Sequence, residues 1–245
     1  MRIPRIYQAI ELIPGQIVSL DPRATHHLVN VLRFKRGQTF ILFNGQGDEC
    51  EAGLSMDNRR HALARIVKLL DTTERESLLK IHLGQAISRG EKMDFTIQKA
   101  VELGVTEITP LLGERCEWIN DEARIQKRLL HWQAIAISAS EQCGRTKIVT
   151  ILPPLPLDKW LELAHTGHRL VLHHRAQQSL SHLGQPYNNQ ISLMIGPEGG
   201  WSDSEIQQAE SQGFIGIQLG PRILRTETAA LAALTALQCC FGDLK

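Results

Sequence analysis

Two segments, GPEGGWS at residues 196–202 and LGPRILRTETAALAAL at residues 219–234, decide the fold. Each follows a short apolar run that is typical of a buried strand, and each leads into a helical pattern. Ser202, with Glu205 three residues later, forms the capping-box pattern that begins a helix. Two successive strand–loop–helix units indicate a parallel sheet, and ligands bind such sheets beyond the carboxyl ends of the strands. The two segments therefore predict a ligand site as well as a fold.

The same alternation extends back to residue 77 and predicts an α/β domain with a mostly parallel sheet and helices on both faces. Apolar residues recur at helical spacing in the two long segments that the expected helices occupy. The expected strands cover residues 78–87, 106–112, 147–152, 169–173, 191–195 and 216–219, and the expected helices cover 91–103, 122–142, 157–164, 203–212 and the chain from about 227.

The first 70 residues have a different pattern, in which short β-type runs alternate with turns. Asp21-Pro22 begins one helix, since Asp is a good N-cap and proline suits the first helical position. The polar run at residues 71–76 is the expected connector. We therefore expect a small β-barrel at residues 1–72 and the α/β domain at residues 73–245, with barrel strands at 17–20, 39–43, 50–56 and 63–70.

Composition narrows the class of protein only a little. The formal net charge is +1, but residues 1–72 hold 10 Lys and Arg against 7 Asp and Glu, which mildly favours a nucleic-acid-reading barrel. There is no signal-peptide pattern at the start and no apolar run of roughly 18 residues. The five cysteines include no C-x-x-C pair and are typical of buried thiols in a reducing compartment. We expect a cytoplasmic protein without a membrane span.

The loop at residues 196–200 has three glycines in five residues, which lets backbone approach a ligand closely. A phosphate cradle is disfavoured, because neither the Gly-Lys-Ser/Thr nor the G-x-G-x-x-G pattern is present. Glu198 would also put a carboxylate where a pyrophosphate needs positive charge. The loop suits a neutral or cationic ligand such as S-adenosylmethionine, although a plain tight turn explains it equally well in isolation.

The loop at residues 219–229 is too long for a simple turn and carries Arg222 and Arg225 before an alanine-rich helix. Two interpretations are open. In the first, the arginines are solvated and Thr226 or Thr228 caps the helix. In the second, the loop packs on a ligand and an arginine holds an acidic group or a developing anion.

Both segments resemble the cofactor motifs of the SPOUT methyltransferases, and most closely those of the 16S ribosomal RNA (uracil-N3)-methyltransferase family. The resemblance extends along nearly the whole chain. It includes MRIPRIY at residues 1–7, HHLVNVLR at 26–33, GEKMDFTIQKAVELGV at 90–105 and SEQCGRT at 140–146. Val101 stands where the family pattern suggests threonine.

The resemblance implies a PUA-like RNA-binding barrel followed by an α/β trefoil knot, in which the segment at residues 219–229 is threaded through a preceding loop. It also implies a homodimer with the last helix prominent at the interface, and 16S rRNA within the small ribosomal subunit as substrate. S-adenosylmethionine would be held by three knot loops, at Leu172, His173, Gly196, Pro197, Glu198, Gly199, Gly200, Leu219, Gly220, Ile223, Leu224, Arg225, Thr226, Thr228 and Ala229.

Methylation of uracil N3 requires loss of a weakly acidic imino proton, and an arginine beside the base would stabilise the anion. Arg225 and Glu198 are the candidate catalytic residues, with Glu198 a possible proton acceptor or a loop residue, and Glu227 is assigned to the start of the helix. Two His-His pairs lack further ligands at metal spacing, so no metal is expected. The candidate RNA contacts are Arg2, Arg5, His26 and Arg33 in the barrel, and Arg89, Lys92, Arg115 and Arg145 beyond it.

Two other functions fit part of the sequence. Another SPOUT methyltransferase would modify a ribose 2′-oxygen or guanine N1, and the barrel-first order argues against it. An RNA-binding assembly factor without catalysis would have no reason to bind S-adenosylmethionine.

Overall fold

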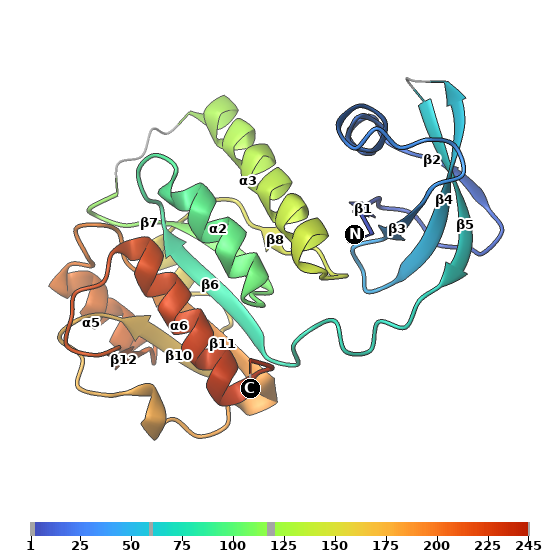
Figure 1. Cartoon of the computed structure of the whole chain (residues 1–245). Helices are drawn as coiled ribbons and strands as arrows, with labels where there is room; N and C mark the ends of the chain where they lie inside the picture. Colours follow the sequence, from blue (N-terminus) through green and yellow to red (C-terminus); the bar gives the residue numbers. More distant parts are fainter. Residues whose placement is uncertain (1–2, 59–60, 117–120, 245) are drawn as a thin grey trace. The chain divides into compact units, whose positions relative to one another are not determined.

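The computed structural model describes residues 3–58, 61–116 and 121–244, and the chain divides into two compact units (Figure 1). The first unit is Met1–Glu76 with Ser140–Ile148, and the second is Ser77–Ala139 with Val149–Lys245. The segment 140–148, which the sequence assigns to the second domain, groups with the first unit. Its Glu141 carboxylate accepts hydrogen bonds from the Tyr7 N–H and from the Arg23 guanidinium, both at 2.9 Å.

A five-stranded mixed sheet with the order β1-β3-β4-β5-β2 builds the barrel-like first unit. Only the β1–β3 pairing is parallel. The strands are β1 Arg5–Tyr7, β2 Ile17–Ser19, β3 Thr39–Phe43, β4 Glu49–Asn58 and β5 His61–Leu69. The sequence missed β1, because a three-residue strand that pairs with a distant segment leaves no periodic pattern.

The helix that the sequence predicts at Asp21-Pro22 is present in the first unit. The Asp21 carboxylate accepts a hydrogen bond from the Ala24 N–H at 2.6 Å, and Pro22 begins α1 (Pro22–Thr25). The helix continues as a π-helical segment, His26–Val31, whose buried Leu28 joins a core built around Phe40, Leu42, Leu54 and Ile66. Two residues beyond this segment, Arg33 has φ 55°, a conformation uncommon for a side-chain-bearing residue.

The second unit has a parallel sheet with the order β12-β10-β11-β6-β7-β8, and β9 also pairs with β7. The predicted alternation of strands and helices is confirmed. The strands are β6 Lys80–Ala86, β7 Glu107–Leu112, β8 Thr150–Ile151, β9 Leu155–Pro156, β10 His168–Leu172, β11 Gln190–Ile195 and β12 Ile215–Ile217, and the helices are α2 Lys92–Glu102, α3 Glu122–Cys143, α4 Leu157–Leu161, α5 Asp203–Ser211 and α6 Thr226–Phe241. Short 3-10 turns at Leu180–His182 and Tyr187–Asn189 join β10 to β11.

Helices cover both faces of this sheet. Figure 1 shows α2 and α6 side by side on one face, where they contact each other, while α5 lies on the other. Trp160 of α4 and Ile206 of α5 pack with Val171 of β10 and Met194 of β11 in one apolar core. Among the described residues, no helix is both long and apolar enough to cross a membrane.

Two boundaries beside the predicted ligand loops differ from the sequence prediction. The strand expected at residues 216–219 is Ile215–Ile217, and the helix expected from residue 227 begins at Thr226. The loop between them therefore runs over residues 218–225. The end of the strand could not be placed from periodicity alone, because Gln218 and Leu219 continue the polar–apolar alternation beyond Ile217. The predicted capping box is confirmed: the Ser202 hydroxyl accepts from the Glu205 N–H, and the Glu205 carboxylate accepts from the Ser202 N–H.

Candidate active site

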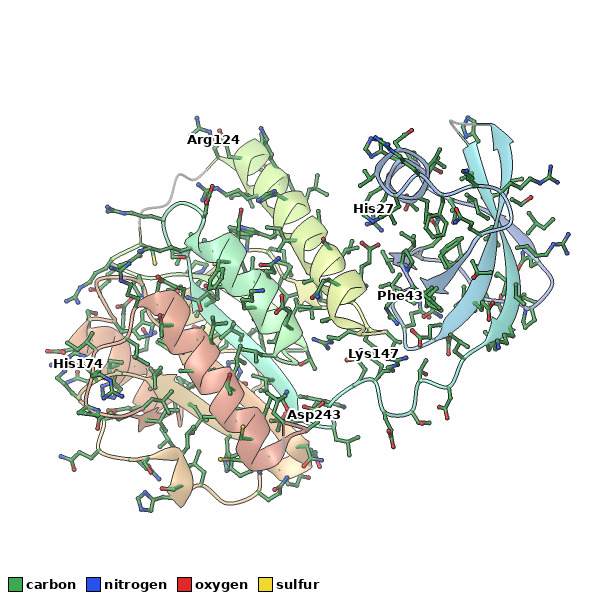
Figure 2. All side chains as sticks on the ribbon, in the orientation of Figure 1. His27, Phe43, Arg124, Lys147, His174 and Asp243 are labelled. Atoms are coloured by element: carbon green, nitrogen blue, oxygen red, sulfur yellow. The ribbon has the colours of Figure 1, made fainter. Side chains whose placement is uncertain are left out.

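A cleft of about 670 Å³ lies beyond the carboxyl ends of three neighbouring parallel strands, β10, β11 and β12. The loops that follow these strands line it, at residues 172–175, 195–201 and 218–226. Figure 2 shows His174 at the outer end of the first of these loops. This is the edge of the sheet where an open parallel architecture places its ligands. The volume is within the roughly 300–1,000 Å³ range of small-molecule sites.

Nearly all the sequence-predicted cofactor residues line this one cleft. Thr228 does not, because it is exposed on the first turn of α6 and points away from the lining. Both candidate catalytic residues, Arg225 and Glu198, are among the lining residues. The predicted residues found there are Leu172, His173, Gly196, Pro197, Glu198, Gly199, Gly200, Leu219, Gly220, Ile223, Leu224, Arg225, Thr226 and Ala229.

The loop after β11 is a tight turn held from several sides. The Gly200 N–H donates to the Pro197 carbonyl at 2.9 Å, and Gly200 has φ +66°, where a side chain would be strained. The Gly199 carbonyl accepts from the Arg115 guanidinium. At Gly196, a Cβ would lie 3.2 Å from the Trp201 ring, so glycine lets that buried indole close the base of the loop.

Glu198 is fixed in this loop by hydrogen bonds from two sides. Its Oε1 accepts from the Arg89 N–H at 3.2 Å and from Lys92 Nζ at 3.1 Å. Partial burial by itself raises the pKa of the Glu198 carboxyl, but these bonds and one from its own N–H outweigh that effect and leave the pKa below its usual range. The carboxylate is therefore a weak proton acceptor at neutral pH.

A hydrogen-bonded connection joins the loop after β11 to the start of α6. The buried Thr226 hydroxyl donates to the Gly196 carbonyl at 2.6 Å and accepts from Gln85 Nε2 at 3.0 Å. Gln85 lies on β6 and is fully buried. The sequence analysis missed it, although a glutamine within the buried strand LGQAI was a usable signal, because buried polar side chains need a partner.

The histidine of the loop after β10 is held neutral. Burial lowers the pKa of His173, and the neighbouring Arg175 and His174 lower it further, while Glu210 opposes them. A Cβ at Gly216 would lie 2.5 Å from His173 Nε2, so glycine in β12 makes room for this ring. The cleft thus offers an uncharged imidazole beside Leu172 at neutral pH.

Positive charge gathers at the rim of the cleft. Arg222 and Arg225 are exposed, and Arg225 is the N-cap residue of α6. Ile223 between them is 80% exposed, which is unusual for a large apolar side chain in a loop. His174, Arg175 and Gln218 also line the site, although no site role was predicted for them from the sequence; Arg175 forms an ion pair with Asp203. The signal for them was their position directly after a strand end.

The candidate RNA contacts fall into two groups. Lys92 and Arg115 line the cleft, Arg89 is exposed next to it, and His26 and Arg33 are exposed on the first unit. Arg2 lies outside the described residues.

Two of the candidates are instead held in ion pairs within the first unit. Arg5 pairs with buried Glu49 and donates to the Arg145 carbonyl at 2.8 Å. Arg145 pairs with Glu76 at 2.8 Å and is 8% exposed. These guanidinium groups organise the unit around the 140–148 segment.

The described residues contain no group of three or more His, Cys, Asp or Glu side chains that could hold a metal ion. The cleft itself presents glycine-rich backbone, a neutral imidazole, a fixed carboxylate and exposed arginines.

Comparison with known proteins gives matches along the whole chain. The family model described as "RNA methyltransferase domain" matches residues 74–238, and "RNA methyltransferase PUA domain" matches residues 20–67. "Ribosomal RNA small subunit methyltransferase E" of Buchnera aphidicola subsp. Schizaphis graminum is 41% identical over 99% of this chain and 98% of its own. The protein of the same name from Bacillus subtilis is 27% identical over 93% of this chain and 94% of its own.

Two solved structures are similar over the full length of both chains. One is a ribosomal RNA small subunit methyltransferase E from Neisseria gonorrhoeae bound to S-adenosyl methionine, with a TM-score of 0.93 and 42% identity. The other is a Legionella pneumophila protein in complex with the bound cofactor SAM, with a TM-score of 0.95 and 43% identity.

Proposed function

This chain belongs to the RNA methyltransferase family, and from that membership we propose that it methylates N3 of a uridine in 16S ribosomal RNA with S-adenosylmethionine as methyl donor. The observation that carries the proposal is the cleft in which three strand-end loops converge, on a chain that matches cofactor-bound relatives from end to end. The first unit, with its PUA match, is the RNA-binding part.

The residues of the cleft fit S-adenosylmethionine. Glycines at 196, 199, 200 and 220 leave backbone N–H and C=O groups within reach of an adenine edge and an amino-acid moiety. Gly220 has φ +70°, which glycine adopts without strain. Glu198 brings a carboxylate to the lining and His173 is neutral there, so neither of these side chains repels a sulfonium. Leu172, Leu219 and Ala229 supply apolar contact.

When bound, the cofactor supplies an electrophilic methyl group, and the chain's own residues prepare the uridine. Arg225, exposed at the rim, stabilises the anion that forms when N3 loses its imino proton to solvent water or hydroxide. Glu198 holds its loop against Lys92 and the Arg89 backbone rather than taking that proton, because its lowered pKa makes it a weak base. N3 lies on the pairing edge, so the target uridine must be unpaired or flipped into the cleft.

We assign the RNA contacts to the candidate basic residues that are exposed or line the cleft. Lys92 and Arg115 on the cleft contact phosphates that flank the target, and His26 and Arg33 of the first unit contact RNA farther away. Arg5 and Arg145 contribute by shaping the first unit. The substrate is rRNA within the small subunit, and the protein works in the cytoplasm.

We assign a homodimer to the protein, with α6 at the interface. From Thr228 to Phe241 this helix carries no charged residue, and its outward positions include Leu231, Ala232 and Ala236, which are only partly buried within the chain. A second copy would cover this charge-free face.

The proposed function is tested with labelled S-adenosylmethionine and small subunits from cells that lack the gene. Label should pass to 16S rRNA in those subunits and not in wild-type subunits, whose target is already methylated. Calorimetric titration of the pure protein with the cofactor is the companion measurement. An RNA-binding assembly factor without catalysis would neither bind the cofactor nor transfer the label.

A further inference from the structure

Among the described residues, Gln85 is the only side chain that donates a hydrogen bond to Thr226. Its Nε2 donates to Thr226 Oγ1 at 3.0 Å and to the Ala86 carbonyl at 3.1 Å. A carbonyl oxygen only accepts, so the amide nitrogen, and not the amide oxygen, faces this pair of acceptors. Thr226 Oγ1 consequently accepts a hydrogen bond from Gln85 and donates its own to the Gly196 carbonyl, 2.6 Å away.

The Thr226–Gly196 hydrogen bond joins two neighbouring segments that both line the cleft. Gly196 begins the loop after β11, and Thr226 begins α6 at the end of the loop after β12. Both line the cleft, whereas Gln85 lies behind them on β6. The direction of the Thr226 hydroxyl therefore depends on a residue that does not itself reach the cleft.

Stability alone does not explain a glutamine at this position. Gln85 is fully buried, and its Oε1 has no hydrogen-bond partner among the described residues. An unpartnered buried acceptor costs free energy that an apolar side chain of similar length would avoid. A glutamine that leaves an acceptor unpartnered while it fixes a hydroxyl in the cleft is better explained by ligand binding in the cleft than by stability of the fold.

We propose that Gln85 is a positioning residue for the methyl donor. By fixing the Thr226 hydroxyl, it holds the Gly196 loop and the start of α6 at the separation that S-adenosylmethionine requires. The proposal rests on the proposed function, since it presumes this cofactor in the cleft. Gln85 touches neither the cofactor nor the reacting atoms and acts through Thr226.

The first test replaces Gln85 with methionine, which has similar length and no donor. Gln85→Met should melt at or above the wild-type temperature, yet bind S-adenosylmethionine about tenfold more weakly in calorimetry, because one hydrogen bond that orders the site is lost. The turnover rate at saturating cofactor should stay close to that of the wild type. Thr226→Val should show the same loss of affinity, and Thr226→Ser should retain affinity.

The double variant Gln85→Met/Thr226→Val tests whether the two residues act together. It should bind the cofactor no more weakly than either single variant, since each change breaks the same connection. Additive losses would show that Gln85 does not act through Thr226 and would overturn the proposal.

Gln85→Glu gives a second measurement, the pH dependence of cofactor affinity, which would not change if Gln85 had a purely structural role. A glutamate can donate to Thr226 only when its carboxyl is protonated, so cofactor affinity of this variant should fall as pH rises, relative to the wild type measured alongside.

A Gln85→Met protein that melts earlier but binds the cofactor like the wild type would assign Gln85 a structural role and overturn the proposal. If that variant fails to fold, the Thr226→Val and Thr226→Ser pair decides, and equal affinities in the two would contradict it. A wild-type protein that does not bind S-adenosylmethionine would overturn the proposed function itself, a result distinct from normal wild-type binding with unaffected variants.

Discussion

At the scale of single residues, we propose Arg225 as the side chain on which the chemistry depends most. It is exposed at the rim of the cleft, at the N-cap position of α6. Arg225→Ala should lower the turnover rate at saturating RNA by about a hundredfold, as expected for loss of one donor to a developing anion. The rate should recover partly at higher pH, because hydroxide then generates the uridine anion that the guanidinium favours.

Steady-state kinetics across pH measures both effects. The matched control is Arg124→Ala, since Arg124 is an exposed arginine of α3 paired with Asp121 and lies outside the cleft lining. An Arg225→Ala protein that loses only RNA affinity, with the wild-type pH profile, would reduce Arg225 to a substrate-positioning residue.

A variant of Glu198 tests whether this carboxylate accepts the proton that N3 loses. Because its pKa lies below the usual range, the carboxylate is ionised through the neutral range and is lost as a clamp only when pH falls through that lowered value. Glu198→Gln keeps an acceptor for the Arg89 N–H but loses the charge that faces Lys92. We expect a turnover rate within about threefold of the wild type, since such exposed ion pairs are worth little.

The pH–rate profile of Glu198→Gln gives the decisive comparison. If Glu198 were the proton acceptor, the variant would lose turnover by at least about a hundredfold and its profile would lose the limb that belongs to the base. Retained turnover with an unchanged profile is the outcome we predict.

At the scale of elements, the start of α6 forms one wall of the cleft. Ala229 is 9% exposed and lines the cleft, while its neighbour Thr228 is exposed on the same turn and outside the lining. Ala229→Leu should weaken cofactor binding by at least about tenfold, since the larger side chain occupies space that the cofactor needs. Calorimetry on Thr228→Leu is the control, because it places the same side chain on the outer face of the same turn.

Equal affinities for Ala229→Leu and Thr228→Leu would remove the first turn of α6 from the site. A thermal melt of both variants without cofactor separates this result from unfolding, because overpacking at a nearly buried position can itself cost about 1–3 kcal/mol.

Elements with a strong period were predictable from sequence, and those without one were not. The apolar spacing of α2 and α3, and the capping box of Ser202 and Glu205 at the start of α5, were enough to place these helices. The end of β12 was placed two residues late, because Gln218 and Leu219 continue the polar–apolar alternation after the strand has ended.

Side-chain roles that depend on distant partners were less predictable. The sequence shows Arg5 and Arg145 as basic residues, but their partners Glu49 and Glu76 lie 44 and 69 positions away. Only the fold brings those carboxylates close. For the same reason Gln85, 141 positions from Thr226, did not stand out as a residue of the site. The loops of the cleft were predictable because parallel strands place their carboxyl ends together.

At the scale of the whole molecule, the threading of residues 219–229 into a trefoil knot stays a prediction from the family resemblance, as does the homodimer. We expect sedimentation equilibrium at micromolar concentration to give a dimer. Thr235→Glu adds charge to the exposed face of α6 without touching the buried Ala233 and Leu234, and should give folded monomers. Ser211→Glu at the exposed end of α5 is the control. A wild-type monomer would contradict the assigned interface.

The position of the transferred methyl group tests the central claim most directly. Small subunits from cells that lack the gene are incubated with the protein and labelled S-adenosylmethionine, and the 16S rRNA is digested to nucleosides for mass spectrometry. The account predicts label in 3-methyluridine and in no other nucleoside. Label in a ribose 2′-O-methyl nucleoside or in 1-methylguanosine would contradict it, because the role that we propose for Arg225 is to stabilise the uridine N3 anion.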